Sequence, residues 1–185
     1  MQCMASETFS YDLKIPHDRV AVLIGKKGGM KRQLEFQTKT KITVDSEEGD
    51  VMIVGNDAVN LFTAREVIQA IGRGFNPELA TLLLNQDYLF ESMNIKDYAK
   101  TKNDELRLKG RIIGEEGKSR RVIEELTECY ICVYGKTISI IGIVEQLPLA
   151  RRAIEMLLAG SPHATVYQWL EKQRSKIKQM KAVQW

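Results

Sequence analysis

Single polar residues separate four hydrophobic side chains near the start of the chain, Phe9, Tyr11, Leu13 and Ile15. Side chains two positions apart lie on one face of a β-strand, so this alternation predicts a strand with one buried face. Pro16 follows directly, and proline interrupts the hydrogen bonding of a sheet. We therefore predict that the first strand ends at this proline.

A helical pattern of hydrophobic positions occurs twice. The pattern i, i+3, i+7, i+10 begins at Leu61 and begins again at Leu147, 86 residues later. This spacing places all four side chains on one face of an α-helix. Gly74 and Gly160 follow the two segments, and glycine ends a helix at low cost. The chain is therefore predicted to contain two equivalent helices.

The repeat includes the segments that precede these helices. Residues 24–44 (IGKKGGMKRQLEFQTKTKITV) align without a gap with residues 113–133 (IGEEGKSRRVIEELTECYICV). A short hydrophobic strand that ends in glycine follows each segment, VMIVG in the first copy and ISIIG in the second. Such repetition indicates two copies of one structural unit. Each copy is predicted to run strand, helix, glycine turn, helix, strand, strand, helix.

Each copy contains a GxxG turn between two predicted helices, Gly25 to Gly28 and Gly114 to Gly117. Glycine adopts positive φ without strain, and its lack of a Cβ atom lets a phosphodiester approach the main chain. The helix after such a turn presents unpaired N–H groups and the positive end of its dipole to an anion. A single GxxG means little in a chain with 13 glycines, but its repetition in one context predicts two anion-binding turns.

Charge favours a polyanionic partner mainly around the first turn. The net charge of +3 is too small to identify a nucleic-acid-binding protein. Between residues 25 and 41, however, six basic residues stand against Glu35 alone, and five more lie between residues 171 and 181. Lysine and arginine at this density attract a phosphate backbone. The first turn is therefore the better electrostatic site, whereas Glu115 and Glu116 of the second turn repel a phosphate.

The segment IGKKGG, followed by a basic helix and ITV, resembles the KH domain, and the order of elements resembles its eukaryotic-type form. In KH domains a GxxG loop clamps about four nucleotides. The resemblance implies an apolar groove for single-stranded bases and an α+β fold of two tandem eukaryotic-type (type I, βααββα) KH domains packed together, with a C-terminal helix. The expected domains are residues 6–75 and 89–160, with a connecting helix or linker at 76–88 and a basic helix at 161–185.

Longer segments resemble one KH-protein family. GRGFNPELATLLL, KGRIIGEEGKSRRVIEELT and AGSPHATVYQWL are similar to an archaeal and eukaryotic family that assists rRNA processing and assembly of the small ribosomal subunit. Its eukaryotic members are partners of the endonuclease that trims the 3′ end of small-subunit rRNA. The resemblance implies single-stranded RNA binding near that end, with the endonuclease or a translation-initiation factor as further partners. The alternative is a protein-interaction scaffold in which one or both KH units do not bind RNA.

The resemblance also implies which residues contact RNA, through the turn, the helix after it and the apolar groove. In the first copy these residues are Val20, Ile24, Gly25, Lys26, Lys27, Gly28, Lys31, Arg32, Lys41 and Ile42. In the second copy they are Arg111, Ile113, Gly114, Gly117, Lys118, Arg120, Arg121 and Ile131.

Other classes of function find little support in the sequence. Cys129 and Cys132 form a single CxxC without a second metal-binding pair, so we expect no metal and no cofactor. The GKS that ends the segment after Gly114 lacks the glycine that a nucleotide-binding loop needs at Ile112, so we expect no enzyme. No hydrophobic run approaches the roughly 18 residues of a membrane span, and the N-terminus lacks a secretory pattern. These features predict a cytoplasmic protein without a membrane partner.

Overall fold

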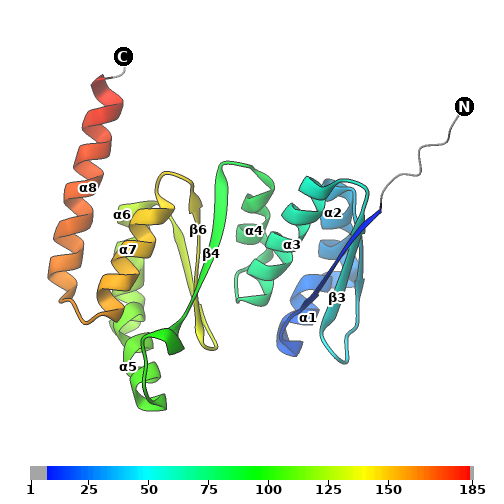
Figure 1. Cartoon of the computed structure of the whole chain (residues 1–185), viewed down its shortest axis with the longest axis horizontal. Coiled ribbons are helices and arrows are strands. Elements are labelled where there is room, and N and C mark those ends of the chain that lie inside the picture. Colours follow the sequence, from blue (N-terminus) through cyan, green and yellow to red (C-terminus); the bar gives the residue numbers. More distant parts are fainter. Residues whose placement is uncertain (1–7, 184–185) are drawn as a thin grey trace, which may run out of the picture. The chain divides into compact units, whose positions relative to one another are not determined.

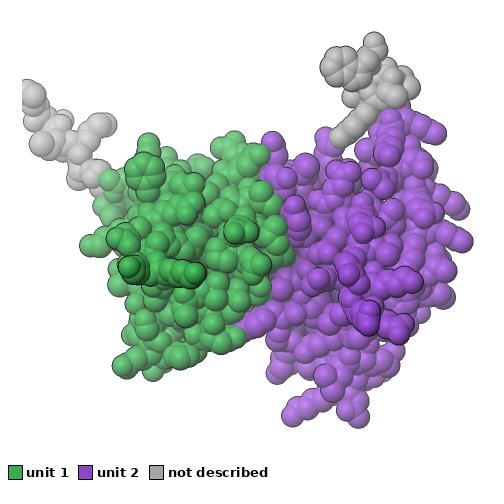
Figure 2. Space-filling model, turned by 180° about the vertical axis from the view of Figure 1, so that it is seen from behind, with its two compact units in different colours: residues 1–86 green, residues 87–185 purple. Residues whose placement is uncertain are grey.

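The computed structural model describes residues 8–183, with side chains as far as Gln179. The chain forms two compact units, residues 1–86 and 87–185 (Figure 2). This division falls inside the predicted connecting segment, residues 76–88. No helix in the described part of the chain is long and apolar enough to cross a bilayer.

The first unit is a three-stranded antiparallel sheet with helices packed on one face (Figure 1). The strand order β1-β3-β2 leaves β1 and β2 at the edges of the sheet. The short helices α4 and η2 pack against α3 within this unit. The elements are β1 (Phe9–Lys14), α1 (His17–Ile24), η1 (Lys26–Gly28), α2 (Gly29–Thr38), β2 (Lys41–Val44), β3 (Asp50–Gly55), α3 (Ala58–Gly72), α4 (Pro77–Ala80) and η2 (Thr81–Leu84).

The second unit repeats this arrangement and adds a C-terminal helix (Figure 1). Its strand order is β4-β6-β5, and α8 packs against α6 and α7. The elements are β4 (Tyr88–Asn94), η3 (Ile95–Asp97), α5 (Lys102–Ile113), η4 (Glu115–Gly117), α6 (Lys118–Thr127), β5 (Tyr130–Tyr134), β6 (Thr137–Ile143), α7 (Leu147–Leu158) and α8 (His163–Val183). The predicted order of strands and helices, βααββα in each copy, is confirmed.

Each unit has its own hydrophobic core between the sheet and the helices. Alternate side chains of the central strand point toward the helices, as the period of two predicts. Val166 and Leu170 of α8 are buried in the second core, which makes the C-terminal helix part of that unit. Equivalent and fully buried core positions are Leu23, Ile53 and Ile68 in the first unit and Ile112, Ile140 and Ile154 in the second.

The register of strand pairing identifies equivalent positions in the two sheets. Ile53 of β3 faces Tyr11 on β1, and Ile140 of β6 faces Glu91 on β4. Since Ile53 and Ile140 occupy the same place in the repeat, Tyr11 and Glu91 are equivalent too. One edge strand therefore carries an aromatic side chain where the other carries a carboxylate.

Candidate nucleic-acid interface

The two GxxG turns adopt the same backbone conformation. α1 ends at Gly25 with φ 71° and ψ 178°, and α2 begins after Gly28, whose φ is 75°. The corresponding values are 73° and 177° at Gly114 and 78° at Gly117. In each turn the N–H of the second glycine donates to the carbonyl of the first, at 3.2 and 3.3 Å. All four glycines therefore occupy positions that require positive φ.

The first glycine of each turn is also required by close packing. A Cβ atom on Gly25 would lie 2.7 Å from the Cβ atom of Met30. A Cβ atom on Gly114 would lie 2.6 Å from the main-chain nitrogen of Ser119. No atom would lie that close to a Cβ on the second glycine of either turn. The first glycine thus lets the next helix pass close to the turn.

The two residues between the glycines are exposed in both turns. These are Lys26 and Lys27 in the first unit, and Glu115 and Glu116 in the second. Lys27 and Glu116 have φ of 52° and 49°, a conformation that residues other than glycine rarely adopt. Neither α2 nor α6 has a side-chain N-cap or an acidic residue in its first turn. The first N–H group of each helix, on Gly29 or Lys118, donates to the carbonyl of Lys26 or Glu115. No acidic side chain balances the positive end of either helix dipole, which can therefore attract an external anion.

Two of the arginines predicted to contact RNA also brace the turns. Arg32 donates from Nε to the carbonyl of Gly28 at 3.2 Å and from Nη2 to the carbonyl of Lys27. Arg121 donates from Nη2 to the carbonyl of Glu116 at 2.8 Å. Both side chains are exposed, so their positive charge lies at the turn and faces solvent.

Sequence reasoning missed a repeated role for Glu35 and Glu124. Each carboxylate accepts a hydrogen bond from the main-chain N–H of the next strand, Ile42 in one unit and Ile131 in the other, at 2.8 Å. Each also pairs with the basic residue four positions earlier in its helix, at 3.9 and 3.7 Å. The sequence contained a signal for this role, since a glutamate recurs at the same place in both copies of the repeat.

Lys31 and Arg120 are those two basic partners, and both are half-buried. Each lies in the first turn of the helix that follows a GxxG turn, three residues after the second glycine of that turn. Their charge is partly balanced by the glutamate, so they contribute less attraction for a phosphate than an unpaired lysine. We therefore predict that Lys31 and Arg120 contact RNA more weakly than an unpaired lysine would.

The apolar residues predicted to line the grooves differ in exposure. Val20, Ile42 and Ile131 are buried in the cores, whereas Ile24 is half-buried and Ile113 is 37% exposed. Ile24 and Ile113 immediately precede the two turns. They therefore offer the accessible apolar surface closest to the main-chain site.

Three further basic residues of the prediction lie in different surroundings. Lys118 is the exposed first residue of α6, next to the second turn. Lys41 is exposed on β2, on the sheet face away from the helices. Arg111 is half-buried and donates from Nε to the carbonyl of Leu157 at 3.2 Å and from Nη2 to that of Ser161 at 2.7 Å. The structure thus places Lys118 beside a turn, whereas Lys41 and the guanidinium of Arg111 lie elsewhere.

The described part of the chain contains no cluster of His, Cys, Asp or Glu that could hold a metal ion. Cys129 is buried, and burial raises the pKa of its thiol to about 11. Such a thiol is unreactive near neutral pH, because the thiolate is the nucleophile and the metal ligand.

Comparison with known proteins gives the same assignment for both units. A family model described as the eukaryotic-type KH domain (KH domain type I) matches residues 89–175, and the KH domain model matches residues 10–70. The chain is 48% identical over 177 residues to a KH domain-containing protein of Methanocaldococcus jannaschii, covering 94% of this chain and 78% of that protein. It is 33% identical over 143 residues to the RNA-binding protein pno1 of Drosophila melanogaster, covering 75% of this chain.

A solved structure from Pyrococcus horikoshii agrees with these matches. It is an a/eIF2alpha–aDim2p–rRNA complex, 45% identical to this chain, with a TM-score of 0.86. The match covers 91% of this chain and 96% of the other. The chain belongs to the Dim2 and PNO1 family of KH-domain proteins.

Membership of the Dim2 and PNO1 family confirms the resemblance read from the sequence. The chain spans 57% of the length of the Drosophila PNO1 protein, but 78% of the archaeal relative. Its two KH units are therefore the part shared across the family. The individual RNA-contacting residues stay predictions.

Proposed function

We propose that this chain binds a single strand of small-subunit rRNA near its 3′ end during ribosome assembly. The observation that carries this proposal is the pair of GxxG turns with the same backbone angles and exposed central residues. The family supports it, because the Drosophila relative is named an RNA-binding protein and the Pyrococcus Dim2p was solved with rRNA and a/eIF2alpha. A translation-initiation factor and the 3′-end endonuclease are the proposed protein partners, in the cytoplasm.

Binding at these turns requires no catalytic step. A phosphate approaches the exposed main chain of the glycine turn and lies at the positive end of the dipole of the following helix. The adjacent bases contact the apolar surface of Ile24 or Ile113. In the first unit Lys26 and Lys27 add charge, whereas the second relies on main-chain groups, with Lys118 beside them.

Exchanging the charges of the two turns tests this proposal. We expect Lys26→Glu with Lys27→Glu to weaken binding of a single-stranded rRNA 3′-end fragment about tenfold at 0.1 M salt, since two phosphate contacts are lost. The slope of log affinity against log salt should fall in magnitude by about 1.4. Fluorescence anisotropy over a salt series measures both quantities.

The reverse exchange, Glu115→Lys with Glu116→Lys, should strengthen binding, because it gives the second turn the charge of the first. Lys27 and Glu116 already share one left-handed conformation, so neither exchange needs a new backbone. Lys100→Glu with Lys102→Glu makes the same change of charge at the exposed start of α5, at the opposite end of that helix from the turn. An affinity loss as large in this control would show only a general charge effect and would contradict the proposal.

The acidic second turn supports one alternative, a unit that serves protein interaction only. In that case the lysine exchange in the second turn leaves RNA affinity unchanged, and the glutamate exchange in the first turn removes all salt-sensitive binding. The same titrations therefore decide between two RNA-binding units and one.

A further inference from the structure

Among the described residues, no strand pairs with the outer side of β1, which forms the edge of the first sheet opposite β2. Ile15 continues the pairing of β1 with β3, because its N–H donates to the carbonyl of Gly49 at 2.9 Å. Alternate residues of an antiparallel strand bond to the same neighbour. Ser10, Asp12 and Lys14 therefore direct their main-chain groups away from β3. Unpaired N–H and C=O groups at an exposed edge form a template for another strand.

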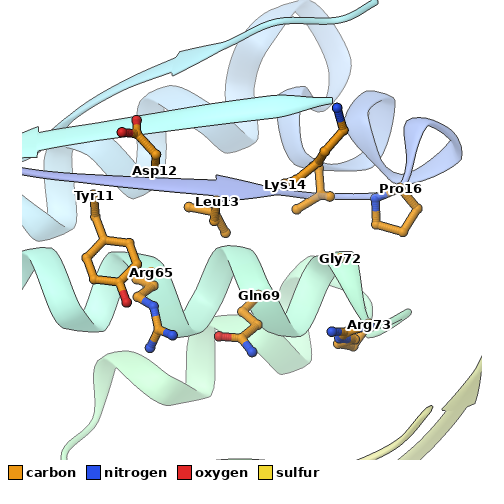
Figure 3. A pocket seen from close by; sticks show the side chains of 10 residues that line it. Tyr11, Asp12, Leu13, Lys14, Pro16, Arg65, Gln69, Gly72 and Arg73 are labelled. Carbon is orange, nitrogen blue, oxygen red and sulfur yellow. The ribbon is translucent and has the colours of Figure 1, made fainter. Parts of the chain in front are cut away.

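A hollow of about 290 Å³ lies beside this edge, between β1 and α3 (Figure 3). Tyr11 and Leu13 point from β1 toward α3, whereas Asp12 points to the other face of the sheet. Arg65 and Gln69 of α3, and Arg73 directly after α3, also line the hollow (Figure 3).

The spacing of Arg65, Gln69 and Arg73 matches that of an extended chain. They lie four residues apart, which corresponds to steps of about 6 Å along a helix. Two residues of a β-strand span about 6.6–6.8 Å, and alternate side chains share one face. A peptide paired with β1 would therefore place positions i, i+2 and i+4 opposite Arg65, Gln69 and Arg73 in turn.

The charge in the hollow is positive and accessible. The guanidinium of Arg65 stacks on Tyr11, with its carbon 4.6 Å from the ring centroid. Only its Nη1 is paired, with Glu66 at 3.0 Å, and a guanidinium has five N–H donors. Arg73 has no ion-pair partner among the described side chains. Lys14 also borders the hollow, but its ammonium group pairs with Glu48 and Asp50.

In the second unit, the arginine equivalent to Arg65 pairs with carboxylates of its own unit. The offset of 86 residues makes Arg151 and Glu155 of α7 equivalent to Arg65 and Gln69. Arg151 pairs with Glu91, the counterpart of Tyr11 on the edge strand, and with Glu155 at 2.9 Å. Hydrogen bonding to Arg151 holds the pKa of the Glu155 carboxyl below its usual value. The second unit thus supplies its own carboxylates to an arginine that lacks a strand carboxylate in the first.

We propose that β1 and the Arg65, Gln69 and Arg73 face of α3 form a docking site for an extended acidic segment of a partner protein. The segment adds as a strand beside β1, with two carboxylates four residues apart on Arg65 and Arg73. Strand addition at a free edge takes affinity from main-chain hydrogen bonds and specificity from alternate side chains. A peptide fits better than RNA, because a sugar–phosphate chain has no alternating amide donors and acceptors.

Two peptides of one composition test the spacing. The probe acetyl-TEVTVET-amide has glutamates four residues apart, on one face of a strand, whereas acetyl-TEVTEVT-amide has them three apart, on opposite faces. We expect the first peptide to bind the full chain about five- to tenfold more tightly than the second. Only the first can contact both arginines, and one partly exposed charge-assisted hydrogen bond makes a difference of this size. Nuclear magnetic resonance titration should shift the amide signals of Ser10, Asp12 and Lys14 first.

Two variants with matched controls test the two halves of the site. Tyr11→Glu gives Arg65 an internal carboxylate, as in the second unit, and should remove the preference for the first peptide, whereas Tyr11→Gln should keep it. Asp12→Pro removes one outward N–H group of the edge and should abolish binding, whereas Asp12→Ala should not. Circular dichroism and the unshifted signals of the core show that each variant is folded.

Three results would overturn the proposal. These are equal binding of the two peptides, peptide binding that survives Asp12→Pro, and displacement of the peptide from β1 by a single-stranded RNA decamer. Exchange of the turn lysines leaves peptide binding intact under this proposal, so a failure here is distinct from a failure of RNA binding at the turns.

Discussion

Four residues other than glycine have positive φ in the described part of the chain, and they fall in equivalent pairs. Lys27 and Glu116 lie inside the glycine turns, and Lys39 and Glu128 follow α2 and α6, with φ of 52° and 54°. Lysine and glutamate give no sequence signal for this conformation. It is set by the main chain, since Lys39 ends its helix with an N–H bond to the carbonyl of Glu35.

Glycine at these helix ends should stabilise the fold. We expect Lys39→Gly and Glu128→Gly each to raise the free energy of unfolding by about 0.5–1 kcal/mol. The left-handed conformation strains a residue that has a Cβ atom but not glycine, and this relief exceeds the entropic cost of fixing a glycine. Urea denaturation at constant m-value measures the change. Lys39→Ala and Glu128→Ala remove the same side chains without relieving the backbone, so stabilisation by alanine as large as by glycine would contradict this explanation.

At the scale of elements, the sequence predicted strands and helices well wherever a hydrophobic period was long or repeated. The strands β3 and β6 were both predicted to end in glycine, and β3 does end at Gly55, but β6 continues one residue past Gly142. The sequence did not reveal why glycine is needed at these two positions. A Cβ on Gly55 would meet Thr40 at 3.0 Å, and one on Gly142 would meet the sulfur of Cys129 at 2.3 Å. Such contacts join residues that are distant in sequence, and no period of hydrophobic positions records them.

Two arginines that link α1 to the end of α3, and α5 to the end of α7, show the same limit. Arg19 donates to the carbonyls of Ile71 and Phe75 at 2.8 and 2.6 Å, and Arg111 makes the equivalent pair of bonds in the second unit. Arg19 lies six residues before its GxxG turn and Arg111 three, so the gapless alignment pairs Arg111 with Val22. The sequence therefore did not reveal the structural role of Arg111, and the charge of this residue suggested an RNA contact.

Arg111 should matter for stability more than for RNA binding. We expect Arg111→Lys to lower the free energy of unfolding by about 1–2 kcal/mol, because lysine cannot reproduce two bonds from one planar guanidinium. Arg19→Lys is the matched variant in the first unit and should cost a similar amount. RNA affinity of the folded Arg111→Lys protein should equal that of the parent, measured well below the unfolding midpoint. A loss of affinity without a loss of stability would restore Arg111 as an RNA contact.

At the scale of the whole molecule, one chain carries two turns of the same shape and opposite charge. A KH unit clamps about four nucleotides, so a short RNA can engage only one turn at a time. A longer strand held at one turn reaches the other at an effective concentration set by the connecting RNA, which raises its affinity without any new contact. The glutamates of the second turn lower the RNA affinity of that unit by itself. When a strand is already held at the first turn, even a weak second site raises the overall affinity.

RNA length should therefore change the effect of damaging one turn. Gly114→Asp and Gly117→Asp add negative charge to the second turn and strain its positive φ. With both changes, a five-nucleotide RNA should bind almost as before, because the first turn is intact. A fifteen-nucleotide RNA should lose about tenfold or more, since its second contact is gone. Anisotropy titrations with both lengths measure this, and thermal unfolding shows that the variant keeps its fold. Equal losses at both lengths would mean that the two turns do not share one strand.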